Sequence, residues 1–339
     1  MAARYGNYPL DVRTLTSKVV LPLQLSVSNR YGVLVGDSGA SKLLQVRRGG
    51  NVSTVASGPQ PGDVAGVDVN AHGDIAYTTT GYKTGKAGLT IRSHGKSRFV
   101  DLSAFERNYN PDKNIRYGTT TTNPCVLEAL KKAQFPVSYR GLADSHPYAV
   151  AAVRGGWVVA DAGGNDLLLV DAKGHVRVLA VLPAQPHKIT AADAKALGAP
   201  DCVVGVVYGF EAVPTDVEVS HGALYISTLP GGPDAPGFSP RGSVYRLTLL
   251  SHQLRRLATG FDGATNLAIT PSGRILVAEL YAGRVSTIEH GRPSGVINLP
   301  GVASLEFYGH ALYAGQTPPT DDKGNPTGPG KVVSVSVRW

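Results

Sequence analysis

A short apolar segment, a turn and a second segment rich in aliphatic residues and tyrosine recur six times along the chain. The copies occupy residues 23–39, 66–80, 148–164, 215–228, 265–280 and 303–316. Most of the turns contain glycine, which tolerates the positive φ that tight hairpin turns require. The glycines assigned to turns are Gly32, Gly73, Gly156, Gly222 and Gly273. Each copy therefore predicts a β-hairpin.

A third strand segment follows every hairpin, and a fourth follows five of the six. The third segments are residues 41–46, 88–93, 166–171, 242–247, 283–289 and 331–337. The fourth segments are residues 52–57, 97–103, 175–182, 254–260 and 295–300. The sixth unit lacks a fourth strand, which residues 13–20 can supply. Because such a shared unit closes a ring and removes exposed sheet edges, the sequence predicts an all-β fold: a single six-bladed β-propeller over residues 1–339, closed by an N-terminal strand.

The long insertions of this predicted propeller all fall on one face. Residues 104–145 and 183–212 each follow a fourth strand, whereas residues 229–241 and 317–330 join a second strand to a third. In an antiparallel blade these points return to the face where the first strand begins. The opposite face receives only tight turns. Loops that are long on one side only are typical of a lid or a binding rim, so we expect 104–145 and 183–212 to be lid-like.

Short helices and one cysteine are predicted in each of these two insertions. Residues 124–134 carry apolar side chains at helical spacing, and a threonine-led capping pattern begins a helix over 190–197. Cys125 and Cys202 lie in the two insertions, on adjacent blades and on the same face. We expect a disulfide between them, the alternative being two free buried thiols. A disulfide indicates an oxidising compartment, so we expect a secreted or periplasmic protein whose leader has been removed.

Composition narrows the classes of partner. The 339 residues include 41 Gly and 23 Pro, and only 17% are charged, which is typical of a turn-rich β protein. The net charge is +8, but no basic block is longer than two residues, so no stripe for nucleic acid is present. No apolar run approaches the roughly 20 residues that span a bilayer. We therefore expect a protein that does not bind nucleic acid and has no membrane span, and we also expect a monomer.

Several motifs resemble those of the ScyD/ScyE family, a group of exported six-bladed NHL-like propellers. The resemblance rests on Ser145-His-Pro-Tyr148, Asp161-Ala-Gly-Gly-Asn-Asp166 with Leu167–Asp171, Ala212-Val-Pro-Thr215 and Val244-Tyr-Arg246, and covers roughly residues 100–290. His146 stands where the family pattern has Asn. The resemblance implies the propeller fold and export, and it brings no settled reaction.

Polar side chains are expected to meet at the channel mouth on the insertion-bearing face. First strands contribute Gln24, His146, Tyr148, Thr215, Asp216, Asn266 and Ser304, and second strands contribute Asp37, Asp161, Ser227, Glu279 and Gln316. The four acids of this set, Asp37, Asp161, Asp216 and Glu279, are candidate ligands for Ca²⁺ or another divalent cation, which prefers oxygen donors. The alternative is that each aspartate accepts hydrogen bonds from its own loop backbone.

Three functions are compatible with this sequence. We favour a binding propeller that holds a small molecule, a glycan or a protein partner at the insertion-bearing face, with Gln24, Thr215, Asn266 and Gln316 as ligand contacts, because no catalytic motif is present. The second is a metal-dependent hydrolase, lactonase or lyase that uses the acidic ring. The third, which the resemblance to the ScyD/ScyE family implies, is an accessory enzyme of secondary metabolism with His146 and Tyr148 as acid and base.

Overall fold

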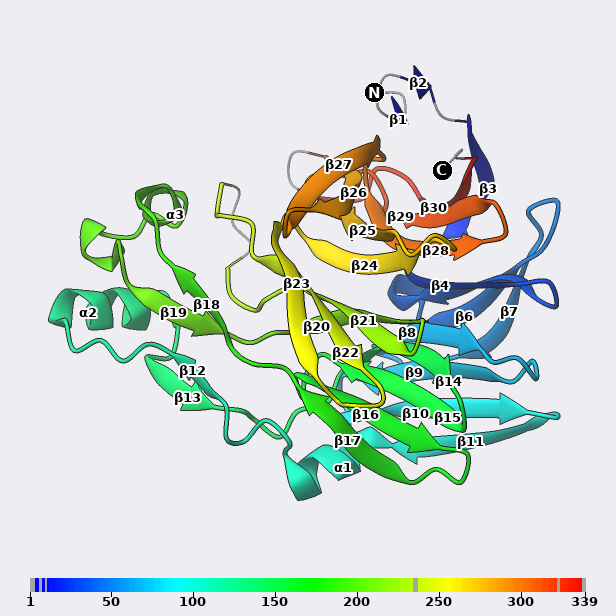
Figure 1. Ribbon diagram of the computed structural model, residues 1–339, viewed down its shortest axis with the longest axis horizontal. Coiled ribbons are helices and arrows are strands. Elements are labelled where there is room, and N and C mark those ends of the chain that lie inside the picture. Colours follow the sequence, from blue (N-terminus) through cyan, green and yellow to red (C-terminus); the bar gives the residue numbers. More distant parts are fainter. Residues whose placement is uncertain (1–3, 6–7, 10, 234–236, 322–323, 337–339) are drawn as a thin grey trace.

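The computed structural model describes residues 4–5, 8–9, 11–233, 237–321 and 324–336. In this part of the chain, six sheets form a ring in which the first strand of each sheet packs against the first strands of its two neighbours, β4 being followed by β8, β14, β20, β24, β28 and again β4 (Figure 1). Each sheet has the strand order of one antiparallel meander, and we call it a blade. The predicted propeller is confirmed.

The strand bounds agree with the predicted segments within a few residues. Blade 1 contains β4 (Pro22–Ser28), β5 (Gly32–Asp37), β6 (Lys42–Val46) and β7 (Val52–Ser57). Blade 2 contains β8 (Gly62–Val69), β9 (Ile75–Gly81), β10 (Lys86–Ser93) and β11 (Lys96–Asp101). Blade 3 contains β14 (Pro147–Val153), β15 (Gly156–Asp161), β16 (Asp166–Asp171) and β17 (Val176–Val181).

The second half of the ring follows the same order. Blade 4 contains β20 (Pro214–Ser220), β21 (Ala223–Thr228), β22 (Gly242–Thr248) and β23 (Leu254–Phe261). Blade 5 contains β24 (Ala264–Ile269), β25 (Ile275–Glu279), β26 (Arg284–Glu289) and β27 (Arg292–Asn298), extended by β1 (Arg4–Tyr5) and β2 (Tyr8–Pro9). Blade 6 contains β28 (Val302–Tyr308), β29 (Ala311–Gln316), β30 (Gly330–Ser336) and β3 (Asp11–Val19).

The N-terminal strand β3 completes blade 6, as predicted. It pairs with β30 in antiparallel register, with Thr14 opposite Val333 and Val12 opposite Val335. Residue 337, the last of the predicted strand 331–337, lies outside the described residues. The ring is thus closed by hydrogen bonds between the two ends of the chain.

The core is divided among the six blade interfaces. Six separate clusters of buried aliphatic side chains each join one consecutive pair of blades. Leu34 and Val67, for example, meet between blades 1 and 2, and Val35 and Val332 meet between blades 1 and 6. Because middle strands are covered on both faces, β5 is buried almost throughout, whereas the outer strand β7 is largely exposed. This explains why the inner segments are continuous apolar runs in the sequence.

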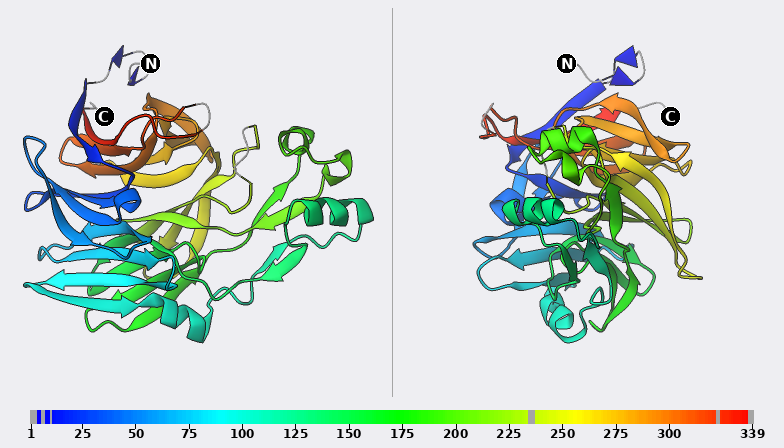
Figure 2. Two further views of the ribbon diagram at one scale, coloured as in Figure 1. Left: turned by 180° about the vertical axis from the view of Figure 1, so that it is seen from behind. Right: turned by 90° about the vertical axis from the view of Figure 1, so that its left-hand side faces the viewer.

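Residues 104–145 and 183–212, which we call the insertion module, project from one face of the ring (Figures 1 and 2). They contain the expected helices α2 (Pro124–Lys132) and α3 (Ala191–Ala196), and η2 (Asp201–Val203). The module also has its own sheet, which the sequence did not predict. Its order is β13 (Ser138–Arg140), β12 (Arg116–Gly118), β19 (Val207–Phe210) and β18 (Gln185–Lys188). The two insertions therefore form one structural unit.

Two local predictions are corrected. The segment 97–103 was expected to be all strand, but Asp101 caps helix α1 (Leu102–Tyr109) by accepting a hydrogen bond from Ala104 N, so the strand ends there. Gly156 is the first residue of β15, and the turn glycine with positive φ (86°) is Gly155. The single turn η1 (Ser38–Ala40) follows β5. No described helix has the length and apolar character needed to cross a bilayer.

Candidate functional site

The disulfide predicted between Cys125 and Cys202 is present and connects the two halves of the insertion module. The Cα atoms are 6.3 Å apart, across a sequence separation of 77 residues. Cys125 is the second residue of α2, whose start is fixed by Pro124 and by the Asn123 side chain, which accepts a hydrogen bond from Cys125 N. Cys202 lies in η2. The bond therefore holds α2 against the second insertion.

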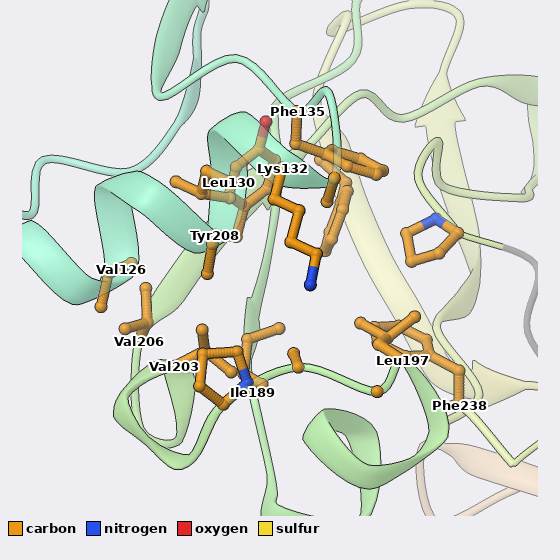
Figure 3. A pocket seen from close by; sticks show the side chains of 17 residues that line it. Val126, Leu130, Lys132, Phe135, Ile189, Leu197, Val203, Val206, Tyr208 and Phe238 are labelled. Carbon is orange, nitrogen blue, oxygen red and sulfur yellow. The ribbon is translucent and has the colours of Figure 1, made fainter.

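An apolar pocket of about 320 Å³ lies inside this module (Figure 3). Helix α2 and the residues after it form one wall through Val126, Leu130 and Phe135, and the segment 189–208 forms the other. Phe238, from the connection between β21 and β22, closes one end. Pockets of this size and character bind small organic molecules in many proteins.

Few polar groups face the pocket, so their positions would determine how a bound ligand is oriented. Figure 3 shows the Lys132 side chain reaching over the cavity from α2. The Tyr208 hydroxyl donates to Pro136 O (2.8 Å) and is already used. The Arg241 guanidinium lies 4.6 Å from the ring centre of Phe210 and 4.5 Å from that of Phe238. Arg241 holds the Phe238 loop by donating to Gly231 O and Pro233 O, so Lys132 is the lining cation, and it favours a ligand that carries a negative group on an apolar body.

Helix α3 fixes the far wall of the pocket through its capping box. Thr190 Oγ1 accepts from Asp193 N, and Asp193 Oδ2 accepts from Thr190 N and bonds to His187 Nε2 (2.9 Å). Asp193 Oδ1 accepts from Ser239 N (2.8 Å), which ties the Phe238 loop to the module. Burial opposes the charge on Asp193, but these hydrogen bonds outweigh it and hold the pKa of the carboxyl well below its usual range. The pocket walls are thus cross-linked by an ionised group.

A second polar site surrounds His146 at the channel mouth. His146 Nε2 lies 2.8 Å from Asp63 Oδ2, and the Tyr82 hydroxyl donates to the same oxygen at 3.2 Å. The rings of His146 and Tyr148 meet edge to face with centres 5.9 Å apart. Burial, followed by the charges of Asp63 and Asp216, raises the pKa of the Tyr148 hydroxyl far above its usual value. Tyr148 therefore stays protonated at neutral pH, and His146 is the group that can exchange a proton.

We expect His146 to titrate above its ordinary value of about 6.5. Burial lowers its pKa, but the hydrogen bond to Asp63 and the charges of Asp63, Asp161 and Asp144 outweigh burial and raise it. A raised folded-state pKa stabilises the fold below the ordinary value, and this stabilisation is lost as pH rises through the raised pKa. NMR titration of the His146 ring should therefore show a lower midpoint in Asp63→Asn than in the wild type.

The same pair predicts how stability changes with pH. The difference in free energy of unfolding between wild type and Asp63→Asn should be larger at pH 5.5 than at pH 8. Equal His146 midpoints in the two proteins would contradict the assignment.

Three of the four predicted ligand-binding residues form hydrogen bonds to other blades of the same chain. Gln24 Nε2, from blade 1, donates to Thr215 O on the opposite blade 4 (2.9 Å). Asn266 Nδ2 donates to Gln24 Oε1 (3.0 Å), and Asn266 Oδ1 accepts from Leu305 N. All three side chains are buried. The fourth candidate, Gln316, donates to Pro300 O near the surface and is not part of this group. Gln24, Thr215 and Asn266 thus bridge the channel.

The four predicted metal ligands do not form one group. Asp37 accepts hydrogen bonds from Val20 N and Leu21 N. Asp161 accepts from His146 N and Ser145 Oγ. Glu279 accepts from Asp262 N and Arg284 Nε. Asp216 accepts from Leu267 N of the next blade. Each orders the chain entering its own or the neighbouring blade, as the alternative interpretation held for the aspartates. No three His, Cys, Asp or Glu side chains of the described residues are arranged to hold a metal.

Sequence reasoning missed Asp63, Tyr82 and the pocket. The predicted first strand of blade 2 began at residue 66, whereas β8 begins at Gly62, so Asp63 was assigned to a loop. It also missed acids inside the channel: Asp68 on β8, Glu218 on β20 and Glu306 on β28. Burial and then their mutual repulsion raise the pKa of Glu218. These three acids could have been identified from the sequence, because all of them lie on predicted first strands.

Comparisons with known proteins identify the architecture. No family model and no curated protein matches this chain. Among solved structures, a gluconolactonase from Xanthomonas campestris is 13% identical with a TM-score of 0.59, over 99% of this chain and 91% of that one. A PQQ-bound aldose sugar dehydrogenase from Streptomyces coelicolor is 12% identical with a TM-score of 0.56, over 97% and 98%. A virginiamycin B lyase from Staphylococcus aureus is 12% identical with a TM-score of 0.51, over 97% and 99%. At such identities the likeness is one of fold.

Proposed function

We propose that this protein is an exported β-propeller that binds a small molecule in the pocket of the insertion module. The observation that carries the proposal is the apolar cavity of about 320 Å³, walled by two insertions that a disulfide joins. A pocket whose walls are already fixed binds without a large ordering cost. The disulfide also agrees with export.

The ligand class follows from the lining. Aliphatic and aromatic walls favour an apolar or aromatic body, and the Lys132 ammonium favours an anionic group at its edge. The net charge of +8 adds a general attraction for anions. We therefore expect an aromatic or aliphatic acid rather than a neutral glycan. We also propose that the protein is a member of the ScyD/ScyE family, which the motifs between residues 145 and 246 support.

Filling the pocket should abolish binding. The probe is 1-anilinonaphthalene-8-sulfonate, an aromatic anion whose fluorescence rises in apolar sites. Leu197→Trp replaces an aliphatic side chain of the cavity wall with a bulky indole ring, and we expect the probe's Kd to rise at least about tenfold, equivalent to about 1.4 kcal/mol. Lys132→Gln should weaken binding by a smaller factor, because it removes the charge and keeps the apolar walls.

The control for this experiment is Leu250→Trp. Leu250 is 97% exposed on the turn between β22 and β23, so this change alters apolar surface without touching the pocket. Probe affinity should equal that of the wild type. If Leu197→Trp and Leu250→Trp bind the probe equally, the pocket is not the binding site.

A second candidate function is acid–base catalysis at the channel mouth. The observation that favours it is the 2.8 Å contact between His146 and Asp63, with Tyr148 beside it, because a carboxylate-oriented imidazole is a common general base. Because a gluconolactonase and a virginiamycin B lyase have the same fold, gluconolactone and virginiamycin B are the first substrates to test. Turnover should be lost in His146→Ala and retained in Leu250→Ala; retention in both would exclude this function for the substrates tested.

A further inference from the structure

Six buried oxygens without a hydrogen-bond partner gather where the insertion module begins. They are both carboxylate oxygens of Glu106, both of Asp166, Oδ1 of Asp112 and Oδ1 of Asn110. Among the described residues, only two other buried side-chain polar atoms lack a partner, and both are threonine hydroxyls in other blades. Buried polar groups are nearly always hydrogen-bonded, so such a concentration requires an explanation.

The fold brings these side chains together from two parts of the chain. Glu106 lies in the last turn of α1, and Asn110 is the C-cap that ends this helix, its backbone N–H donating to Glu106 O; Asp112 follows two residues later. Asp166 is the first residue of β16 in blade 3. A Cβ atom placed on Gly164 would lie 2.6 Å from Glu106 Oε1 and 3.5 Å from Asp166 Cγ. Both carboxyl groups therefore approach the same glycine, which leaves room between them.

The remaining contacts hold the group in place. Asp112 Oδ2 accepts from the Tyr117 hydroxyl (2.9 Å) and from Asn165 Nδ2 (3.1 Å), which leaves Oδ1 free. Asn110 Nδ2 donates to Gly141 O (3.0 Å), which leaves its Oδ1 free. A side chain at Gly141 would overlap Asp112 Oδ1. The glycines at 141 and 164 thus allow the carboxyl groups to approach the backbone closely.

No positively charged side chain in the described part of the chain forms an ion pair with this group. Glu106, Asp112 and Asp166 are each 0% exposed, and none takes part in an ion pair of the described residues. Asp161, whose own oxygens accept hydrogen bonds, adds a further negative charge nearby. Burial, followed by the charges of Asp161, Asp112 and Asp144, raises the pKa of Glu106 to about 8. Buried carboxylates must be protonated, paired or bound to a cation.

We propose that Glu106, Asn110, Asp112 and Asp166 bind a Ca²⁺ ion. Six free oxygens match the lower end of the six to eight that Ca²⁺ takes, and Mg²⁺ usually retains waters instead of filling an all-protein site. The side chains do not yet surround one point closely enough to hold an ion. Binding therefore requires Glu106 and Asp166 to rotate toward each other across Gly164. The ion fastens the start of the insertion to blade 3.

The test uses the full chain after chelator treatment. Calorimetric titration with CaCl₂ should give one bound ion, and 1 mM Ca²⁺ should raise the Tm by about 5 °C relative to chelator, because an ion bound only to the folded state stabilises it. Tb³⁺, a Ca²⁺ mimic, should luminesce on excitation of tyrosine, since the Tyr117 hydroxyl lies next to Asp112. Tyr117→Phe should decrease this signal and leave the Ca²⁺-dependent Tm shift.

Matched variants locate the ion. The double variant Glu106→Gln, Asp166→Asn keeps the side-chain volumes and should lose both the Tb³⁺ signal and the Tm shift. Glu289→Gln, at an exposed strand end, should keep both. The proposal is overturned if the wild type binds no Ca²⁺ at 1 mM, or if the double variant still binds it. A double variant that is more stable than a Ca²⁺-insensitive wild type would also overturn it, because the carboxyl groups would then hold protons.

Discussion

Removal of the Cys125–Cys202 disulfide is expected to unfold the tip of the insertion module while the ring of blades stays folded. The bond closes a loop of 77 residues, for which chain entropy predicts a stabilisation of about 4 kcal/mol. The local hydrophobic core is too small to compensate for this loss of stability, because its buried residues are Ile189, Ala194 and Val203. The double variant Cys125→Ser, Cys202→Ser should therefore expose α2 and η2.

Hydrogen exchange measures this directly. Amides of α2 should exchange much faster in the double variant, and those of β5 and β15 should be unchanged, because the clusters that bury these strands contain no residue of α2 or η2. The short sheet of the module should be affected less, since β12 and β19 pair and Tyr208 still bonds to Pro136. Probe binding in the pocket should be lost in parallel. Unchanged exchange in α2 would show that the helix is held without the disulfide.

The second large effect is expected from Gly36→Ala. A Cβ atom at Gly36 would overlap the carbonyl oxygen of Ala65 in blade 2 and lie 2.9 Å from its carbonyl carbon. These are backbone atoms of an inner strand, so no side-chain rotation relieves the clash. The corresponding residue of blade 3 is Ala160, which is buried without such a restriction. Blades 1 and 2 therefore approach more closely at this level than a methyl group permits.

We expect Gly36→Ala to lower the free energy of unfolding by about 3 kcal/mol, the upper part of the range for overpacking, because a whole blade must shift. Urea unfolding followed by circular dichroism gives the value. The matched control is Gly209→Ala in β19, where the nearest atom to the new Cβ is 3.5 Å away, an ordinary contact. If both variants unfold at the same urea concentration, the close approach of blades 1 and 2 does not affect the free energy of unfolding.

The blades could be predicted because each middle strand is covered on both faces and is therefore a continuous apolar run, as in Leu167–Val170 of β16. The module sheet could not, because β12 and β13 are three residues long and Gly118 pairs with Gly209, far away in the chain. The disulfide was predictable from which face each insertion leaves. The oxygen cluster was not, since nothing local connects Glu106 with Asp166.

The candidate site was predicted only in outline. His146 and Tyr148 do lie together, but the partner Asp63 depended on a strand boundary that was four residues off. The acids at the ends of second strands were easy to find and their role was ambiguous, because a carboxylate that orders a loop and one that awaits a ligand have the same local sequence. Only the donors around Asp37 and Asp161 distinguish the two.

The pairing of β3 with β30 has a consequence for how the molecule is made. Contacts such as Thr14 with Val333 join residues more than 300 positions apart, so this closure has a very high contact order. The entropy lost in closing such a long loop must be overcome before the pairing contributes any stability. The pairing of β3 with β30 therefore forms slowly. During synthesis the first five blades can pack in order, while β3 stays an unpaired edge until the last strand leaves the ribosome. In the finished ring the two end strands of the chain can part only when β3 detaches from β30, so this pairing ties the beginning of the chain to its end.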